Sequence, residues 1–503
     1  MPKPLYKVKE LVSYARMNQR RVFDVDSYAS SVYESATGYQ TELERAGLCV
    51  LTFESQPHLL SQGQFMFWPI DDAHPSRLSG ADHVYCSPAR KRPTAIDLFA
   101  GAGGLSLGFE QAGFDVAACV EIDPIHCATH EFNFPYSASI CADVRDLTGQ
   151  LIRERSGIAE RPVDVVCGGA PCQGFSLIGK RAFDDPRNQL VSHYVRLVRD
   201  LSPKYCVFEN VKGLTIGRHV QFLQELIESL RLIGYQVAQP YRVLNAADYG
   251  VPQNRLRLFL LAYREDQVPP VYPMGQHQKV TVGEAISDLP NADDFEELMD
   301  SDTTHVKWKP KSLYSKYLKG LEHDPADFSY TRTYNSDLLT SSLRTTHTAE
   351  SVRRFECAES GMTEPISRFY KLDLKGLCNT LRAGTDSARG AFTSPRPIHP
   401  VYPRVITVRE AARIHSYPDW FRFHVTKWHG FRQIGNSVPP LLGRAVASEI
   451  IHALGISPKY HTQPIALGNP ALLSLDMKQA ANHFSVSSTV IAQRLRKKEK
   501  VAV

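Results

Sequence analysis

Between residues 94 and 263 the chain alternates short apolar runs with amphipathic helical patterns. An apolar run of about four to eight residues bounded by turn residues is typical of a buried strand. Helical periodicity follows the first run at 105–114 and precedes the last at 221–235. Because strands that alternate with helices form parallel sheets covered on both faces, we predict an α/β fold around such a sheet. The predicted strands are 94–101, 116–123, 163–172, 205–211 and 255–263.

This rhythm stops in the middle of the chain and returns later. Residues 267–402 are rich in Pro, Ser, Thr, His and aromatic residues, with basic residues among them, which predicts an irregular second domain inserted into the first. Helical patterns resume at 407–421 and 435–454. We therefore expect one α/β domain that is split in two in sequence, with its parts at 93–266 and 403–455.

Both ends of the chain lie outside this arrangement. Residues 1–92 carry a short helical pattern near residues 8–15 but no motif with a known mechanism, so their role stays open. Within the tail, 456–503, two helical patterns at 475–484 and 488–498 are separated by a short turn. Ala481, Val486 and Ile491 have the spacing of a small helix-turn-helix core, and Arg494, Arg496, Lys497 and Lys498 could meet phosphates. A charged helical terminus that contacts protein is an equally good interpretation of the tail.

Composition narrows the class of protein. The chain has 503 residues, of which 43% are hydrophobic and 22% charged, as in globular domains. The net charge of +5 permits nucleic-acid binding without requiring it. No apolar run reaches the roughly 18 residues of a membrane-spanning helix. The ten cysteines lack a disulfide-like pattern, so we expect reduced thiols in the cytoplasm.

A glycine-rich turn follows the first predicted strand. Gly101 and Gly103 let the backbone turn sharply into a helix and approach a ligand closely. About twenty residues on, the next strand ends at Glu121, a carboxylate that could bind a ribose diol. Asp143 ends a further expected strand and could accept the amino group of an adenine. A nicotinamide-binding unit and a purely structural turn remain alternatives at this point, although the glycine spacing departs from the GxGxxG fingerprint.

A cysteine lies in a rigid loop at the same sheet edge. Cys172 follows an apolar strand and the sequence Gly-Gly-Ala-Pro171, and a nucleophilic role would require its thiolate. Glu209 ends the next strand, where a buried carboxyl is costly unless it is paired or used, or caps a helix. Arg255 and Arg257 alternate at the start of the last strand, so they share a face.

Together these motifs resemble the DNA cytosine-C5 methyltransferases. The resemblance covers about 94–266 and 404–455, in the family's order. It implies a class I S-adenosylmethionine-dependent methyltransferase fold, with a Rossmann-like sheet and an inserted target-recognition domain at 267–402. The motifs are DLFAGAGG, VEID, AD, GGAPCQGFS, ENV, QNRLR, TVREAARI and QIGNSV.

The resemblance assigns a role to each site residue. Cys172 is the nucleophile that adds to carbon 6 of cytosine, Glu209 contacts the N3 side, Arg257 holds the O2 side and Arg255 supports the loop. The methyl donor is S-adenosylmethionine, and no metal is implied. Donor-binding residues are Phe99, Gly101, Gly103, Glu121, Asp143, Pro171, Asn436 and Ser437, and DNA-binding residues are Ser176, Lys180 and Arg181.

The implied substrate is double-stranded DNA with its cytosine extruded from the stack. A cognate restriction endonuclease acting on the same site, without an obligatory complex, is the implied partner, and no membrane is involved. The implied location is the cytoplasm of a bacterium, in association with the nucleoid. RNA methyltransferases share the scaffold, but the Cys-Phe-Thr tripeptide associated with the transfer-RNA subfamily is absent and the insertion is long. A nicotinamide-dependent oxidoreductase and a non-catalytic nucleic-acid-binding protein are the competing hypotheses.

Overall fold

The computed structural model describes residues 92–170, 189–217, 219–276, 278–384, 396–461 and 463–490, with the backbone of three strands near the N-terminus. The chain divides into two compact units, 1–90 and 91–503. In the first unit, β1 (Val22–Asp24), β2 (Leu48–Leu51) and β3 (Gln64–Pro69) form an antiparallel sheet in the order β1-β3-β2. The helix expected near residues 8–15 lies outside the described residues.

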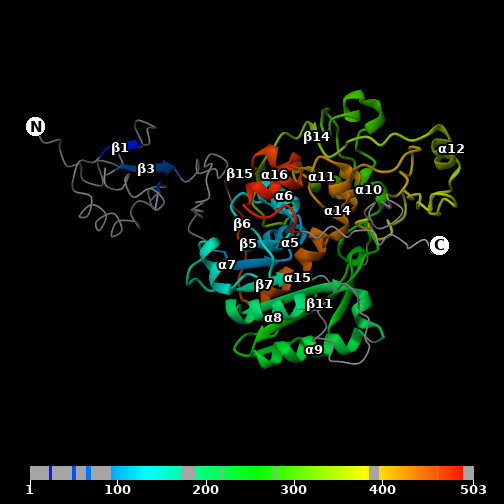
Figure 1. Ribbon diagram of the computed structural model, residues 1–503. Helices are drawn as coiled ribbons and strands as arrows, with labels where there is room; N and C mark the ends of the chain where they lie inside the picture. Colours follow the sequence, from blue (N-terminus) through cyan, green and yellow to red (C-terminus); the bar gives the residue numbers. More distant parts are fainter. Residues whose placement is uncertain are drawn as a thin grey trace, which may run out of the picture. The chain divides into compact units, whose positions relative to one another are not determined.

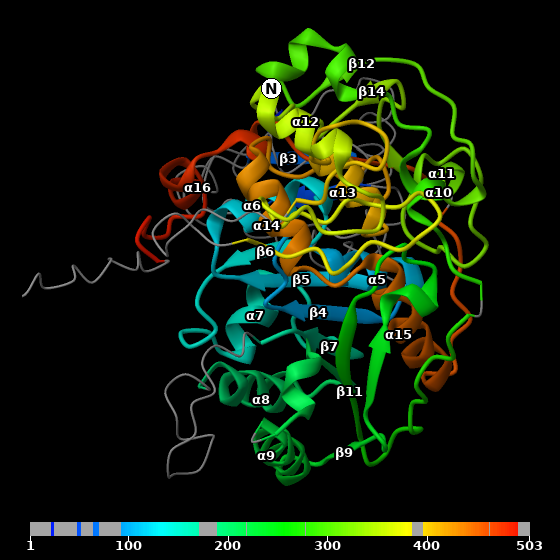
Figure 2. The same ribbon diagram turned by 90° about the vertical axis from the view of Figure 1, so that its right-hand side faces the viewer.

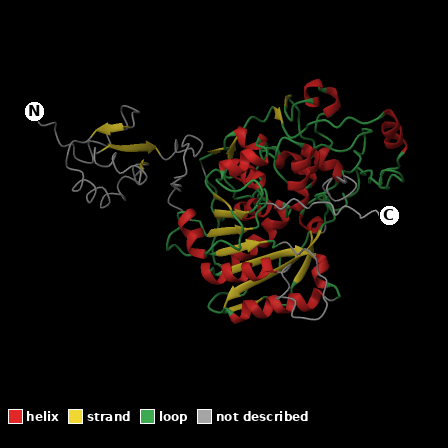
Figure 3. Ribbon diagram, viewed as in Figure 1, coloured by secondary structure: helices red, strands yellow, loops and turns green. Residues whose placement is uncertain are grey.

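A mixed eight-stranded sheet forms the centre of the second unit, with the order β10-β11-β8-β7-β4-β5-β6 and β9 beside β11 (Figure 3). Every pair from β8 to β6 along this order is parallel. The strands are β4 (Thr94–Leu98), β5 (Asp115–Glu121), β6 (Ala138–Cys141), β7 (Val165–Gly168), β8 (Tyr205–Val211), β9 (Tyr235–Val237), β10 (Arg242–Asn245) and β11 (Leu256–Arg264).

The expectation of an entirely parallel sheet is therefore wrong at one edge. β11 runs antiparallel to β8, and both β9 and β10 pair antiparallel with β11. The short strands β9 and β10, which the apolar pattern did not reveal, lie between α9 and β11 in sequence. The chain reaches β11 from β10 through a hairpin-like connection containing the 3₁₀ turn η5 (Ala246–Tyr249), and a hairpin reverses strand direction.

Helices cover both faces of this sheet (Figures 1 and 2). One layer contains α7 (Gly149–Arg155), α8 (Gln189–Leu201) and α9 (His219–Leu232), and the opposite layer contains α5 (Gly104–Ala112) and α15 (Pro440–Ala453). An apolar core joins α5 and α15 to the sheet, with Phe109, Phe259 and Leu442 fully buried. The first helix of the catalytic region thus packs beside its last one.

The region 267–402 contains short elements linked by long irregular segments. It includes β12 (Thr304–His305) paired with β14 (Leu338–Leu339), and β13 (Arg332–Thr333) paired with β15 (Ile465–Ala466) from the tail. Its helices and 3₁₀ turns are α10 (Val282–Ile286), η6 (Ala292–Asp294), η7 (Glu296–Met299), α11 (Leu313–Leu318) and α12 (Ala349–Cys357). These elements, α12 excepted, share an apolar core with α13 (Val408–Ile414) and α14 (Lys427–Asn436), whereas Phe355 of α12 packs with Ile398 and Val405.

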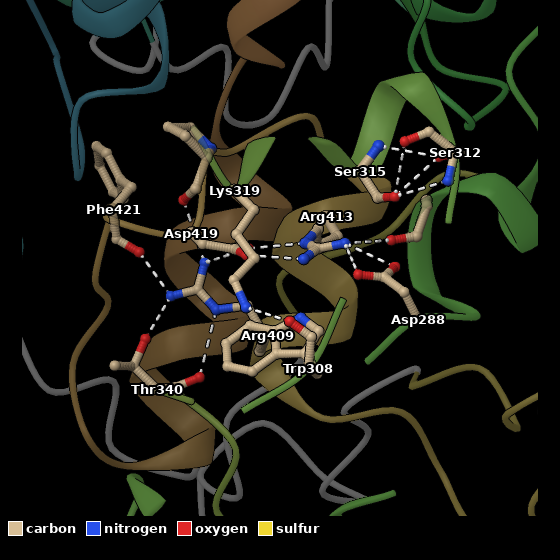
Figure 4. Close-up of polar contacts among 12 residues, drawn as sticks. Asp288, Trp308, Ser312, Ser315, Lys319, Thr340, Arg409, Arg413, Asp419 and Phe421 are labelled. Carbon is tan, nitrogen blue, oxygen red and sulfur yellow. Dashed lines mark hydrogen bonds and ion pairs between the residues drawn. The ribbon is translucent and has the colours of Figure 1, made fainter. Parts of the chain in front are cut away.

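Buried arginines on α13 hold this region in place (Figure 4). Arg413 makes two hydrogen bonds of 2.7 Å to Asp419 and one of 3.0 Å to Asp288. Arg409 donates to Thr340 Oγ1 at 2.6 Å and to the Phe421 carbonyl at 2.8 Å. Because both guanidinium groups are buried and paired, removing a partner would leave a costly isolated charge. The contacts therefore fix α13 against the inserted segments.

The tail continues the core of the second unit. The 3₁₀ turn η9 (Pro470–Ser474) buries Leu472 and Leu473 against Ala128 and Phe132 of α6 (Pro124–Asn133). Helix α16 (Met477–His483) follows and packs on α6. The first expected tail helix is confirmed, whereas most of the second lies outside the described residues. No helix in the described segments is long and apolar enough to span a membrane.

Candidate active site

The glycine turn between β4 and α5 has a left-handed backbone. Phe99, Gly101 and Gly103 have φ values of 63°, 57° and 99°. A Cβ on Gly103 would lie 2.5 Å from Phe134, so only glycine fits there. A Cβ on Gly101 would meet no atom within 4 Å, so open space lies beside the turn. Such an open cradle at a strand-to-helix turn suits a ligand.

Glu121 lies across from this turn, at the end of β5. Its Oε2 accepts the Gly101 N–H at 2.9 Å, and its Oε1 accepts the N–H groups of Ile122 and Asp123, each at 2.9 Å. A carboxylate has about four lone-pair sites, so these bonds leave roughly one, on Oε2. Glu121 therefore fixes the turn and keeps capacity for one ligand hydroxyl.

Asp143 follows β6 at the next strand end. Arg145 donates to its Oδ2 from Nε at 2.9 Å and from Nη2 at 2.6 Å. Although partial burial opposes ionisation, these bonds lower the pKa of Asp143. The carboxylate is thus ionised, and the Arg145 side chain that holds it is exposed.

A buried polar chain lies directly beneath the turn. The Ser106 hydroxyl donates to Asp97 Oδ2 at 2.6 Å and lies 3.1 Å from His130 Nε2, and His130 Nδ1 lies 3.3 Å from Ser139 Oγ. Burial raises the pKa of Asp97 to about 7 and lowers that of His130 to about 3. The sequence pattern does not reveal these residues, because an Asp inside an apolar strand gives no sign of its partners.

The motif expected to close the donor site lies against the same turn. Asn436 ends α14 and is exposed, and Ser437 follows it. A Cβ on Gly104 would lie 2.4 Å from the Val438 carbonyl and 2.9 Å from Ser437 Cβ. The structure thus brings Ser437 next to Gly104, the residue after Gly103, although more than 330 residues separate them in sequence.

Glu209 and Arg257 form an ion pair at the same edge of the sheet. Arg257 Nε donates to Glu209 Oε1 at 2.9 Å, and each side chain remains 13% exposed. Burial raises the pKa of Glu209, although Arg257 and Arg255 oppose the shift. Glu209 caps no helix, because the N-cap of η4 (Lys212–Thr215) is Val211. A carboxyl of raised pKa beside a cation can both hold and release a proton.

The chain leading to the predicted nucleophile contacts this pair. A Cβ on Gly169 would lie 2.6 Å from Glu209 Oε2, and Asn210 Nδ2 donates to the Ala170 carbonyl at 3.0 Å. Asn210 thus holds the carbonyl of the residue before Pro171, a contact that the sequence does not reveal. The predicted site residues Pro171, Cys172, Ser176, Lys180 and Arg181 lie outside the described residues.

Arg255 does not share the environment of Arg257. Its side chain is fully buried, and its guanidinium donates to the carbonyls of Leu381, Gly435 and Ser437, each at 2.8 Å. The alternation along β11 predicted one shared direction, but tertiary contacts give the two guanidinium groups different partners. Arg255 therefore holds three backbone carbonyls, and the supporting role expected from the sequence stays a prediction.

Comparison with known proteins gives one consistent family. Residues 94–452 match the family model for C-5 cytosine-specific DNA methylases. The chain is 61% identical to the Type II methyltransferase M.XorII of Xanthomonas oryzae over 405 residues, which are 80% of this chain and 95% of that protein. It is 32% identical to M.AgeI of Thalassovita gelatinovora, over 71% of this chain and 98% of that protein. A solved E. coli prophage DNA modification methyltransferase superposes with a TM-score of 0.61 and 34% identity, covering 72% of this chain and all of that one.

Proposed function

The chain belongs to the C-5 cytosine-specific DNA methylase family, and on that premise we propose that it methylates cytosine in one specific DNA sequence through a covalent adduct of Cys172. It is a DNA (cytosine-5-)-methyltransferase of the Type II restriction–modification kind, with the expected class I methyltransferase fold. It acts on double-stranded DNA and takes its methyl group from S-adenosylmethionine. This membership removes the oxidoreductase hypothesis.

One observation carries the proposal: the Glu209–Arg257 pair lies against the segment that leads to Cys172. Carbon 5 of cytosine is a poor nucleophile. Addition of the Cys172 thiolate to carbon 6 forms a C–S bond and moves the ring electrons toward carbon 5 and N3. Glu209, with its raised pKa, can supply a proton at N3, and Arg257 offsets negative charge at O2.

S-adenosylmethionine supplies an electrophilic methyl group, which carbon 5 accepts. A base then takes the carbon 5 proton, the C–S bond to Cys172 breaks, and Glu209 takes back the N3 proton, which together restore the aromatic ring. The residues around the glycine turn fit such a donor, because Gly101 faces open space and Glu121 keeps a lone pair for a ribose hydroxyl. Asp143 offers an ionised acceptor for the adenine amine. Phe99, Gly103, Pro171, Asn436 and Ser437 complete the proposed donor site.

The remaining assignments concern DNA. The base must leave the stack to reach the Glu209–Arg257 pair. We assign phosphate contacts to Ser176, Lys180 and Arg181, and choice of sequence to residues 267–402. Methylation would then protect the host's own sites from a cognate endonuclease. A non-catalytic DNA-binding protein would need none of the Cys172, Glu209 and Arg257 chemistry.

A fluorinated substrate tests the covalent step. An oligonucleotide with 5-fluorocytosine at the target position, incubated with donor, should trap the enzyme, because fluorine at carbon 5 cannot leave as a proton does. We expect a protein–DNA complex that survives denaturing electrophoresis with the wild type and none with Cys172→Ser. Calorimetry should show that Cys172→Ser still binds the donor.

The matched control is Cys357→Ser, which replaces an exposed thiol at the end of α12 and should leave trapping intact. A complex of equal yield with Cys172→Ser would refute the assigned nucleophile. Peptide mapping of the trapped protein would then identify the residue attached to the base.

A further inference from the structure

Two fully buried side chains form a directed hydrogen-bond chain behind the candidate active site. The Leu381 N–H donates to Gln253 Oε1 at 3.0 Å, which places the amide nitrogen of Gln253 toward His415 Nδ1 at 2.9 Å. His415 Nδ1 is then the acceptor, so its ring proton is on Nε2, 3.2 Å from the Ser437 carbonyl. Burial lowers the pKa of His415, which agrees with this neutral ring.

Arg255 makes a second buried connection beside this hydrogen-bond chain. It connects the same two segments, since its guanidinium donates to the carbonyls of Leu381, Gly435 and Ser437. All three side chains of this buried polar cluster, Gln253, Arg255 and His415, are 0% exposed. Arg255 Nε has no hydrogen-bond partner among the described residues, but the other guanidinium nitrogens and both ring nitrogens of His415 are bonded, and such a buried network favours one arrangement of the backbone.

The cluster joins the two ends of the proposed reaction site. On one side, Arg257 lies two residues after Arg255 and pairs with Glu209. On the other side, Ser437 packs against Gly104 in the glycine turn. The cluster therefore holds the donor end through the Gly435 and Ser437 carbonyls, and the main chain from Arg255 to Arg257 joins it to the base end.

The segment that contains Leu381 belongs to the region proposed to choose the DNA sequence. Asn254 N–H donates to the Cys378 carbonyl at 2.8 Å, and the Thr380 hydroxyl donates to the Asn254 carbonyl at 2.7 Å. A Cβ on Gly435 would lie 2.3 Å from Ala383 N, so this segment touches the donor-closing motif directly.

The position of His415 is itself fixed. It is the C-cap of α13, the helix that Arg409 and Arg413 hold against the inserted region (Figure 4). A displacement of the inserted region would therefore move α13 and His415, and through His415 the Ser437 carbonyl.

We propose that Gln253, Arg255 and His415 are positioning residues that couple donor binding at the glycine turn to DNA binding at the Glu209–Arg257 end. The inference rests on the proposed function, because it uses the roles assigned to both ends. Donor binding strengthens DNA binding through the cluster, and by linkage DNA strengthens donor binding by the same factor. None of the three side chains touches the reacting atoms.

Binding measurements without turnover test this coupling. DNA affinity is measured by fluorescence anisotropy with and without saturating S-adenosylhomocysteine, and the ratio of the two dissociation constants is the coupling factor. His415→Leu removes the donor to the Ser437 carbonyl and should reduce the factor about 3- to 10-fold, the range expected for one buried hydrogen bond. His415→Gln places an amide donor near the former Nε2 and should restore most of it.

The matched control is Tyr235→Phe. It removes one buried hydrogen bond, from Tyr235 to the Pro203 carbonyl, where β9 pairs with the opposite end of β11. This variant should lower the unfolding temperature and leave the coupling factor unchanged. If His415→Leu does not fold, Gln253→Leu serves as the test, with the same expected loss.

The outcomes separate the two proposals. A wild type that binds no S-adenosylhomocysteine contradicts the proposed function. The inference is overturned if the wild type shows coupling and the folded variants keep the same coupling factor while their unfolding temperature falls. The cluster would then be purely structural. A reduced factor in His415→Leu that His415→Gln restores supports it.

Discussion

Buried ionisable residues hold the glycine turn from below. Asp97 is 1% exposed and its carboxyl accepts the Ser106 hydroxyl, and Ser106 lies on the first turn of α5. His130 closes the chain from α6 and lies against Gly103. Burial therefore shifts the pKa values of groups that hold the first turn of α5, where the donor is proposed to bind.

The raised pKa of Asp97 predicts a pH-dependent stability. Because the folded-state pKa of about 7 exceeds the ordinary 3.8, the contribution of this group is complete below the ordinary value and is lost as pH rises to about 7. At 1.36 kcal/mol per unit the loss is about 4 kcal/mol at most. Asp97→Asn cannot ionise and should flatten this part of the profile, measured by urea unfolding between pH 5 and 8.

Asp146→Asn is the control for removing a carboxylate, since Asp146 is exposed on the same unit. An Asp97→Asn protein whose free energy of unfolding falls with pH as steeply as that of the wild type would show that Asp97 is ionised when folded.

At the scale of elements, two glycines allow α5 and α15 to cross closely. A Cβ on Gly108 would lie 2.7 Å from the backbone of Gly443 and Arg444, whereas a Cβ on Gly443 would meet Gly108 and Leu105 only at 3.4 Å. The crossing brings the beginning and the end of the catalytic region together. It therefore helps to hold Ser437, which precedes α15, beside the glycine turn, which precedes α5. The two positions are chemically identical but sterically different.

Alanine substitutions should separate these two positions. Gly108→Ala forces two backbones apart and should lower the free energy of unfolding by about 1–3 kcal/mol, as overpacking does. Gly443→Ala meets ordinary contacts and gains helix propensity, so it should be neutral or stabilising by up to about 1 kcal/mol. Urea unfolding of both proteins measures the difference. Equal losses would mean that the crossing is looser than the structure shows.

At the scale of the molecule, the tail and the insertion complete the catalytic unit. β15 pairs with β13, Gly468 lies against the backbone of Phe132, and Leu473 is fully buried beside α6. His483 contacts Glu131 at 3.1 Å, and this hydrogen bond raises the pKa of His483. A tail that served only to dock on DNA would not bury its residues in this way.

Two truncations distinguish core packing from DNA binding. A chain ending at Gly455 loses Leu472 and Leu473, and the burial of each side chain contributes about 1.5–3 kcal/mol to the free energy of unfolding. This chain should therefore unfold at a lower urea concentration than the full chain. A chain ending at Val490 keeps that core and should unfold like the full chain. It lacks the five basic residues after Val490, so its DNA affinity should fall with a salt slope smaller by about 0.9 per lost phosphate contact.

The slope is read from log Kd against log salt by anisotropy. An identical slope for the full chain and the chain ending at Val490 would remove the DNA-docking hypothesis for residues 491–503.

The sequence by itself determined the local features. Apolar runs and glycine positions predicted the parallel strands, the sharp glycine turn and the carboxylates at Glu121, Asp143 and Glu209, because side-chain periodicity and backbone sterics act within a few residues. Only the tertiary structure decided the antiparallel direction of β11, the separate partners of Arg255 and Arg257, and the chains through Asp97 and Gln253. These depend on contacts between residues up to hundreds of positions apart, and a hydrogen-bond partner that far away leaves no periodic mark in the sequence.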